Sequence, residues 1–409
     1  MTSSYHLEDR GKCNKNELKT STHNIPKLRF KGYNDEWKKI KLGEHLNICR
    51  GASPRPIEKY ITVENNGVNW IKIGDISPNE NVIKCTKEKI TIEGAKHSRY
   101  VRKGDLILSN SMSFGRPYIL EIDGCIHDGW LLIQDLEKLF DKKYLCYLLD
   151  SDTVKQQYRK YAAGGVVINL NSELVRSVKV YIPNFHEQEK IASFLTLIDK
   201  KIEKQKELVE ILKKYKRGLI SAIFSQKLRF KDDNGNNYPA WKEKYIQDVC
   251  SITTGKGNTQ DKEENGVYPF YVRSPIVEKS NKYIFDGEAV LTVGDGVGTG
   301  KVFHYVNGKF NFHQRVYKMS NFSGINGRYF YYYFSTHFYD RVKRMTAKTS
   351  VDSVRMDMIA KMPIFIPTNE EQDKIINLLT NVEDIFLKNE ESLFLLQEYK
   401  KGLLQKMFI

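Results

Sequence analysis

The chain contains one unit of sequence twice, and this repeat restricts the folds open to it more than any other feature. Lys27-Leu-Arg-Phe30 returns as Lys227-Leu-Arg-Phe230, at a shift of 204 residues. Residues 182–224 then align without a gap with residues 366–408, at a shift of 184, and 16 of these 43 pairs are identical. Because the shift falls from 204 to 184, the first unit carries 20 additional residues in its middle.

The ends of the two units agree, whereas their middles diverge. Near the beginning of each unit, Trp37 and Gly51 match Trp241 and Gly255. Ligand specificity in duplicated proteins tends to lie in loops that a retained scaffold carries. The pattern therefore favours one architecture that reads two different targets, and neutral drift of surface loops is the alternative.

The matching ends of the units have the apolar period of long helices. Apolar residues recur at alternating steps of four and three, which is the seam of a coiled coil. In the first unit the seam consists of Ile191, Leu195, Ile198, Ile202, Val209, Leu212 and Leu219. In the second unit it consists of Ile375, Leu379, Val382, Phe386, Leu393, Leu396 and Leu403. Polar residues interrupt both seams at matching places, at Gln205 and Lys216 in the first and at Asn389 and Lys400 in the second.

Each of these helices needs a partner, because an isolated one would expose its apolar seam. Residues 187–224 carry nine Lys/Arg and six Asp/Glu, a charge of +3, whereas residues 371–408 carry five and seven, a charge of −2. The opposite signs favour pairing of the first helix with the second, and a two-fold relation between the units makes that pair antiparallel. Gln205 and Asn389 lie at the midpoints of the two segments, so we predict that they touch and set the register. The alternative is that each helix packs only on its own domain.

Between these ends, each unit combines short strand-like runs with one helical stretch. Apolar runs flanked by glycine, proline or asparagine predict strands at residues 70–73, 105–108, 118–120 and 130–133. An apolar face of helical period runs from Tyr144 to Val154 and returns from Tyr329 to Phe338. Each unit then closes with a strand that ends in proline, at residues 178–183 and 362–367.

The sequence therefore predicts an α+β fold, in which two long antiparallel coiled-coil helices separate two similar domains with pseudo-two-fold symmetry. The five expected segments are a polar, disordered leader at 1–25, a first domain at 26–182, a first spacer helix at 183–226, a second domain at 227–366 and a second spacer helix at 367–409.

Composition points to a polyanionic partner. The net charge is +15, and each lysine or arginine set against a phosphate releases condensed counterions. No apolar stretch approaches the roughly 20 residues that cross a bilayer, so we expect no membrane association. The six cysteines show no C-x-x-C pairing, which speaks against a zinc site or a disulfide framework and favours reduced thiols in the cytoplasm.

A glycine-rich run at residues 294–301 does not fit a phosphate-binding loop. A P-loop needs glycine where this chain has Asp295, and serine or threonine where it has Val302. We expect a mobile loop between two strands, which can approach DNA closely through its bare backbone.

The signals for catalysis are weak. No Pro-Pro pair is present, although the target-binding motif of DNA methyltransferases needs one. Asp105, Asp123 and Asp128 are scattered, which is more typical of turn-capping residues than of a metal-dependent nuclease. His127 and His313 hold loosely matching places without a spaced partner, as structural or DNA-contacting histidines do. We therefore expect no catalytic or metal-binding residue.

The remaining candidates are basic and small polar side chains in predicted loops, the residue types that meet phosphates and base edges. In the first unit they are Lys72, Ser109, Asn110, Ser111, Ser113 and Arg116. In the second unit they are Lys256, Arg273, Lys301, His313, Arg315, Lys348, Thr349 and Ser350.

With these features together, the chain resembles the specificity subunits of type I restriction-modification systems. The resemblance rests on the alternation of variable domain and retained helix, and on the Ile-Pro-x-x-x-Glu-Gln-x-Lys-Ile opening of each helix at residues 182–191 and 366–375. Residues 70–76 and 103–109 also resemble signatures of target-recognition domains. The second unit departs from those two signatures, with residues 268–272 and 286–291 in their places.

The resemblance implies a non-catalytic clamp on double-stranded DNA. Each target-recognition domain would read one half of a bipartite site, and the helix pair would set the spacer between the halves. Two modification subunits would dock near the helices and methylate adenine with S-adenosylmethionine, and two restriction subunits would use ATP and magnesium. The chain itself would hold no cofactor. The competing interpretations are a free-standing DNA methyltransferase or nuclease, and a protein-binding scaffold.

Overall fold

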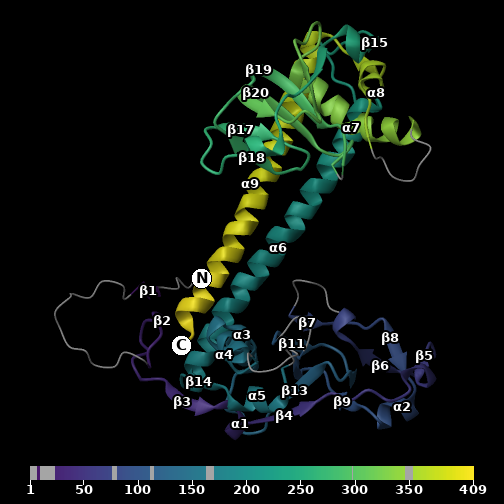
Figure 1. Cartoon of the computed structure of the whole chain (residues 1–409). Helices are drawn as coiled ribbons and strands as arrows, with labels where there is room; N and C mark the ends of the chain where they lie inside the picture. Colours follow the sequence, from purple (N-terminus) through teal and green to yellow (C-terminus); the bar gives the residue numbers. More distant parts are fainter. Residues whose placement is uncertain are drawn as a thin grey trace, which may run out of the picture. The chain divides into compact units, whose positions relative to one another are not determined.

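The chain forms two compact units, and each is built from a globular domain and parts of two long helices. The computed structural model describes residues 7–9, 24–75, 81–110, 115–162, 170–296, 298–345 and 353–409. The first unit consists of residues 1–205 and 392–409, and the second of residues 206–391 (Figure 1).

Two five-stranded sheets form the first domain, and their central strands are the apolar runs of the sequence. One sheet has the order β4 (Leu46–Arg50), β13 (Trp130–Asp135), β10 (Leu106–Ser109), β11 (Pro117–Leu120) and β7 (Val82–Ile83). The other has the order β5 (Ile61–Thr62), β8 (Glu88–Ile90), β6 (Val68–Ile71), β12 (Gly124–Ile126) and β9 (Arg99–Val101). A separate pair joins β3 (Lys38–Lys41) to β14 (Lys179–Ile182). Every residue of β10 is buried, as expected of a strand that is covered on both faces.

The helical stretch of the first domain is broken into α3 (Lys142–Asp150) and α4 (Asp152–Ala162). Ser151 between them has extended backbone angles, and its hydroxyl accepts from the amide of Val154. This differs from the single stretch expected from the apolar period, because Ser151 acts as a cap that the period does not reveal. The shorter helices are α1 (Leu42–His45), α2 (Ile92–Lys96) and α5 (Ser172–Ser177).

The second domain has one six-stranded sheet. Its order is β16 (Ser251–Thr254), β21 (Val316–Ser320), β19 (Phe285–Val293), β20 (Phe303–Phe312), β17 (Tyr268–Tyr271) and β18 (Val277–Ser280). The unbroken helix α7 (Gly327–Met345) packs its aromatic face on this sheet, and β15 (Lys242–Tyr245) pairs with β22 (Pro363–Ile366) beside α8 (Met356–Ala360) (Figure 1).

The two domains share one topology, as the repeat predicts. The antiparallel order β4-β13-β10 of the first domain returns as β16-β21-β19 in the second. The parallel pair β6 and β12 returns as β17 and β20, and the closing pair β3 and β14 returns as β15 and β22. The expectation of an α+β fold with two similar domains is confirmed.

The long helices α6 (Phe185–Phe224) and α9 (Asn369–Met407) lie side by side and antiparallel within each unit. In the first unit Asp199 pairs with Lys400, and in the second Lys216 pairs with Glu383, both at 2.6 Å. Asp199 and Lys216 are 17 residues apart on α6, and their partners Lys400 and Glu383 are 17 residues apart on α9 in the opposite chain direction. The register of the two helices is therefore the same in both units. The two seam lysines thus bind across the helix pair.

Each helix also packs on a domain of its unit. The Tyr147 hydroxyl donates to Asp199 at 2.7 Å, and the Tyr332 hydroxyl donates to Glu383 at 2.9 Å. Burial raises the pKa of both tyrosines, which keeps the hydroxyls protonated and able to donate. The helices therefore pair with each other and with the domains, which the sequence had left as alternatives. A contact of Gln205 with Asn389 would join the two units, and it stays a prediction, as does a two-fold relation between them.

A short strand lies within the expected leader. Leu7–Asp9 forms β1, which pairs antiparallel with β2 (Leu28–Phe30). For the rest of residues 1–25 the expected disorder stays a prediction. An edge strand such as β2 offers free backbone groups to any extended neighbour. Residues 1–6 and 10–23 lie outside the described residues.

Candidate nucleic-acid interface

Four loops of each domain meet at one place, and the same backbone hydrogen bonds join them in both. In the first domain, the loops that follow β4, β6, β10 and β12 are joined by three bonds. These run from Gly51 N to Trp130 O (2.9 Å), from His127 N to Ile71 O (3.1 Å) and from Asn110 N to Gly129 O (3.0 Å). The sequence separates these loops by up to about 80 residues, and only the strand order brings them together.

The second domain repeats this loop cluster after β16, β17, β19 and β20. The equivalent bonds run from Gly255 N to Val316 O (3.3 Å), from His313 N to Tyr271 O (2.9 Å) and from Gly294 N to Arg315 O (2.8 Å). We call the two sets of loops the first and second loop clusters. Each lies at the same edge of its domain.

The glycines that begin the clusters allow a close backbone approach. A Cβ atom added to Gly51 would lie 2.2 Å from the carbonyl oxygen of His127, and one added to Gly255 would lie 2.2 Å from that of Phe312. Real Cβ atoms do not come so close to backbone. The sequence match of Gly51 with Gly255 thus has a packing reason, because no other residue fits there.

The first loop cluster borders a hollow of about 660 Å³. Lys72 and Glu88 form an ion pair on its wall, and Asp128 pairs with Arg55 at 3.4 Å. The His127 ring also lines the hollow and packs edge-on against Trp70, with the ring centres 5.8 Å apart. The hollow thus offers both hydrogen-bond donors and a carboxylate acceptor.

The predicted residues of the first domain have unequal exposure. Lys72 lies on the wall of the hollow, whereas Asn110 is mostly buried and donates to the carbonyl of Asp128 at 2.8 Å. Ser109 is fully buried and bonds to the backbone of Arg116, whose guanidinium donates to Asn81 at 3.0 Å. Asn110 and Ser109 therefore brace the loops from within. Ser111 and Ser113 lie outside the described residues.

The second loop cluster brings together two arginines around one carboxylate. Arg273 and Arg315 each approach Asp295 to 3.5 Å and are at least half exposed. Lys256 is exposed in the same loop as Gly257, whose amide donates to Phe312 O at 3.2 Å. The cluster thus presents an excess of positive charge, which suits a phosphate backbone or a guanine edge.

His313 lies beneath these arginines and is 5% exposed. Burial lowers the pKa of its imidazole, and the positive charge of Arg273 lowers it further. Lys301, by contrast, lies over the ring of Tyr339 on α7 at 5.3 Å. Lys348, Thr349 and Ser350 lie outside the described residues.

Asp128 and Asp295 lie in the clusters, although the sequence had presented them only as a turn-capping residue and as a departure from a P-loop. Arg55 and Gln314 were missed by sequence reasoning, and neither stands in a recognisable motif. Gln314 could have been found from its place directly after His313, which matches the place of Asp128 after His127.

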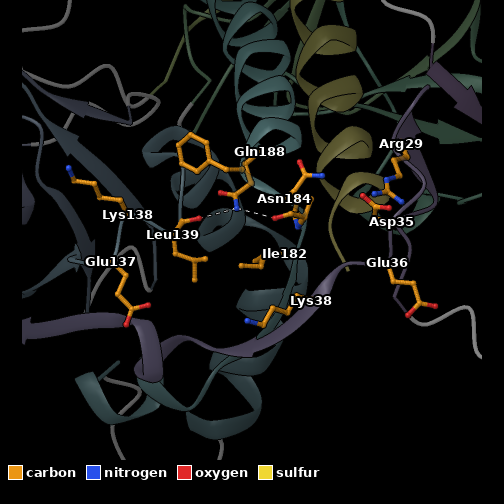
Figure 2. A pocket seen from close by; sticks show the side chains of 12 residues that line it. Arg29, Asp35, Glu36, Lys38, Glu137, Lys138, Leu139, Ile182, Asn184 and Gln188 are labelled. Carbon is orange, nitrogen blue, oxygen red and sulfur yellow. Dashed lines mark hydrogen bonds between the residues drawn. The ribbon is translucent and has the colours of Figure 1, made fainter.

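A second hollow, of about 510 Å³, lies where α6 begins in the first unit (Figure 2). Figure 2 shows Gln188 reaching toward Leu139, and its amide donates to the carbonyls of Leu139 and Pro183, both at 3.2 Å. Arg29 on the same wall is bonded to the buried Glu187 at 2.7 and 2.8 Å. These groups anchor the helix to the domain, so the hollow is not a candidate site.

Within the described part of the chain, no group of three histidine, cysteine or acidic side chains could hold a metal ion. None of the described helices is both long enough and apolar enough to span a membrane.

The fold and the two loop clusters define a duplicated protein, with one equivalent set of loops at the edge of each domain. Comparison with known families agrees. The family described as "Type I restriction modification DNA specificity domain" matches residues 34–217 and again residues 239–393. The chain belongs to this family.

Its relatives are specificity subunits. The chain is 21% identical over 393 residues to the type I restriction enzyme MjaVIII specificity subunit of Methanocaldococcus jannaschii, covering 87% of this chain and 88% of that protein. It is 25% identical over 171 residues to the EcoDI specificity subunit of Escherichia coli, covering 40% of this chain and 37% of that protein. The resemblance noted in the sequence is thus confirmed.

Solved structures show the same fold. The crystal structure of a type I restriction-modification S subunit from M. genitalium superimposes with a TM-score of 0.61 at 15% identity, and the match covers 94% of this chain and 99% of that one. A structure solved for complex assembly and conformational transition of the type I restriction-modification system gives a TM-score of 0.56 at 15% identity, covering 91% and 97%.

Proposed function

We propose that this specificity subunit reads a bipartite site on double-stranded DNA, one half with each loop cluster, and performs no catalysis itself. The observation that carries the proposal is the repeated cluster: one frame of hydrogen bonds occurs twice, with different side chains on it. Two copies of one frame with different polar groups suit two different base sequences. The net charge of +15 supplies the sequence-independent attraction to phosphate.

We expect two modification subunits to dock on the long helices α6 and α9. Apolar side chains on the helices are exposed in both units, for example Ile211 at 62% on α6 and Phe394 at 60% on α9. Such side chains indicate a surface that another protein covers. The modification subunits would bring S-adenosylmethionine, two restriction subunits would bring ATP and magnesium, and the whole enzyme would work in the cytoplasm without a membrane.

The test is to express the full chain with the modification subunits of its host in a strain that lacks other adenine methylation. Sequencing that detects methylated adenine should reveal one asymmetric motif, made of two specified halves and an unspecified spacer. A single continuous motif would contradict the bipartite reading.

Two further measurements separate the competing classes. The purified chain alone, given DNA, S-adenosylmethionine and magnesium, should neither methylate nor cleave, and turnover would identify a free-standing enzyme. The logarithm of its DNA affinity should fall linearly with the logarithm of the salt concentration, because bound phosphates release counterions. Absence of that dependence would favour a protein-binding scaffold.

A further inference from the structure

The loop clusters contain one histidine turn each, and the two turns are built alike. In the first, Nδ1 of His127 accepts from the backbone amide of Gly129 at 2.9 Å. In the second, Nδ1 of His313 accepts from the backbone amide of Arg315 at 3.0 Å. The carbonyls of both histidines also accept from the amide three residues on, Trp130 at 3.0 Å and Val316 at 2.9 Å.

In the second turn this geometry determines which ring nitrogen carries hydrogen. A neutral imidazole that accepts through Nδ1 must carry its hydrogen on Nε2. His313 stays neutral near pH 7, since burial and Arg273 lower its pKa. In the first turn Nδ1 of His127 also lies 2.9 Å from a carboxylate oxygen of Asp128, and the equivalent bond from the Gly129 amide assigns this ring the same tautomer as His313.

The ring of His127 is open to a ligand, since its side chain is 41% exposed, whereas His313 is 5% exposed and presents little of its ring. Among the described residues, no protein group accepts a hydrogen bond from Nε2 of either ring. Neither Nε2 is among the fully buried atoms that lack a partner, so each has some contact with solvent. The rings are also held in place, His127 against Trp70 and His313 by its burial. A rigidly held donor at a repeated place has the preorganisation that a ligand-binding group needs.

The residue that follows each histidine differs in chemistry. Asp128 is acceptor-only as a carboxylate, and Ser53 Oγ and Arg55 hold it at 3.1 and 3.4 Å. Gln314 is exposed and has an amide that both donates and accepts, and its own backbone amide is bonded to Gly257 O at 2.8 Å. A carboxylate accepts from the amino group of cytosine, whereas an amide side chain pairs with adenine through two bonds.

We propose that His127 and His313 are equivalent specificity-determining residues, and that each donates Nε2–H to the acceptor edge of a guanine in its own half-site. Asp128 and Gln314 then make the two halves differ, Asp128 by favouring a neighbouring cytosine and Gln314 a neighbouring adenine. This inference rests on the proposed function, because it assigns atoms to the reading surfaces.

The chain offers a matched pair of substitutions for each turn. His127→Asn retains a side-chain oxygen that can accept from the amide two residues on, so the turn persists while the Nε2 donor is lost. His127→Gln retains a donor at the reach of Nε2 and loses the turn acceptor. The same pair applies at His313, and His97→Asn is the control, because His97 is exposed, pairs with Glu93 and packs on the ring of Tyr60.

The experiment measures the methylated motif of each variant, expressed with the modification subunits, together with its melting temperature. We expect His127→Asn to weaken the preference for one guanine of the first half-site by about tenfold to 100-fold, with the second half unchanged. His313→Asn should do the same to the second half only, while His97→Asn keeps the full motif. The glutamine variants should retain more of the preference than the asparagine variants.

The outcomes separate failure of the proposed function from failure of the histidine inference alone. A wild-type chain that gives no bipartite motif overturns the proposed function. A bipartite wild-type motif that both asparagine variants reproduce unchanged, at an unchanged melting temperature, overturns the inference alone. Asp128→Gln should in addition move the first half-site from cytosine toward adenine next to the guanine, and an unaltered base there contradicts the role of Asp128.

Discussion

The first and second loop clusters have the same frame of backbone hydrogen bonds, and they differ in the side chains that this frame carries. His127 and His313 occupy one place, but Asp128 and Gly129 follow the first, whereas Gln314 and Arg315 follow the second. The first cluster combines donors with a carboxylate beside a hollow, and the second gathers arginines around Asp295. Duplication therefore preserved the backbone hydrogen bonds of the loop clusters, while their side chains diverged.

The domains also differ in how they hold the long helices. Glu187 and Glu371 are both fully buried at the helix starts, and each binds an arginine. In the second domain Glu371 also accepts from the indole of Trp241 at 3.0 Å. The matching indole nitrogen of Trp37 is buried and has no hydrogen-bond partner within the described residues. The glutamate–arginine pair is therefore common to both domains, and the additional hydrogen bond from the indole is present only in the second.

Exchange of a whole domain should have the largest effect, because it tests whether each domain determines one half-site independently. Replacing residues 31–180 with the corresponding domain of another specificity subunit should abolish the original first half-site and install a new one, because the frame is shared and the loops are not. Methylation sequencing should show the second half-site retained. Altered bases in both halves would mean that the domains do not read independently.

The two helix anchors should respond differently to loss of their glutamate. Glu187→Ala leaves Arg29, which is 7% exposed, without its partner, and we expect a loss of about 3–5 kcal/mol in the free energy of unfolding. Glu371→Ala should cost less when it is made in a Trp241→Phe background, where no indole loses its acceptor, because Arg229 is 25% exposed and water can replace the carboxylate. Urea unfolding followed by hydrogen exchange in each unit measures both, and equal losses would contradict the reasoning.

The close approach at the glycines predicts a smaller and more local effect. Gly51→Ala and Gly255→Ala each force a methyl group against a backbone carbonyl, so the loops must separate, at about 1–3 kcal/mol. Each variant should weaken recognition of one half-site. Gly218→Ala on α6 is the control, because a Cβ atom there meets nothing within 4 Å. Unchanged motifs in both cluster variants would show that the frame tolerates the shift.

The smallest effect concerns pH and the second domain. Burial lowers the pKa of His304, and burial with Arg273 and Arg315 lowers that of His313 against the opposing charges of Asp295 and Asp261. Just below the ordinary histidine value of 6.5, the unfolded chain therefore takes up protons that the folded domain does not. The free energy of unfolding should fall as pH drops through this window and level off below the folded pKa. His313→Asn should show a shallower slope between about pH 7 and pH 5, and an identical slope would exclude a contribution of His313.

The duplication, the α+β class and the two long helices could all be predicted from the amino-acid sequence. These depend on local periodicity and on self-similarity, which the chain displays directly: the four-and-three spacing of Ile191 and Leu195 is visible without knowledge of any neighbour. The sequence also named Arg273, His313 and Arg315 as candidates, because basic loop residues are recognisable by type, and their contact with DNA stays a prediction. It did not foresee the cap at Ser151, since a single serine inside an apolar period carries little signal.

Only the tertiary structure decided which loops meet. Strand order places the ends of β4, β6, β10 and β12 at one edge, although strands and loops of other kinds separate them along the chain. Asp128 therefore meets Arg55, and Asp295 meets Arg273, through pairings that no spacing encodes. A reading surface is a property of backbone hydrogen bonds between distant segments, and those bonds form only once the sheets have closed.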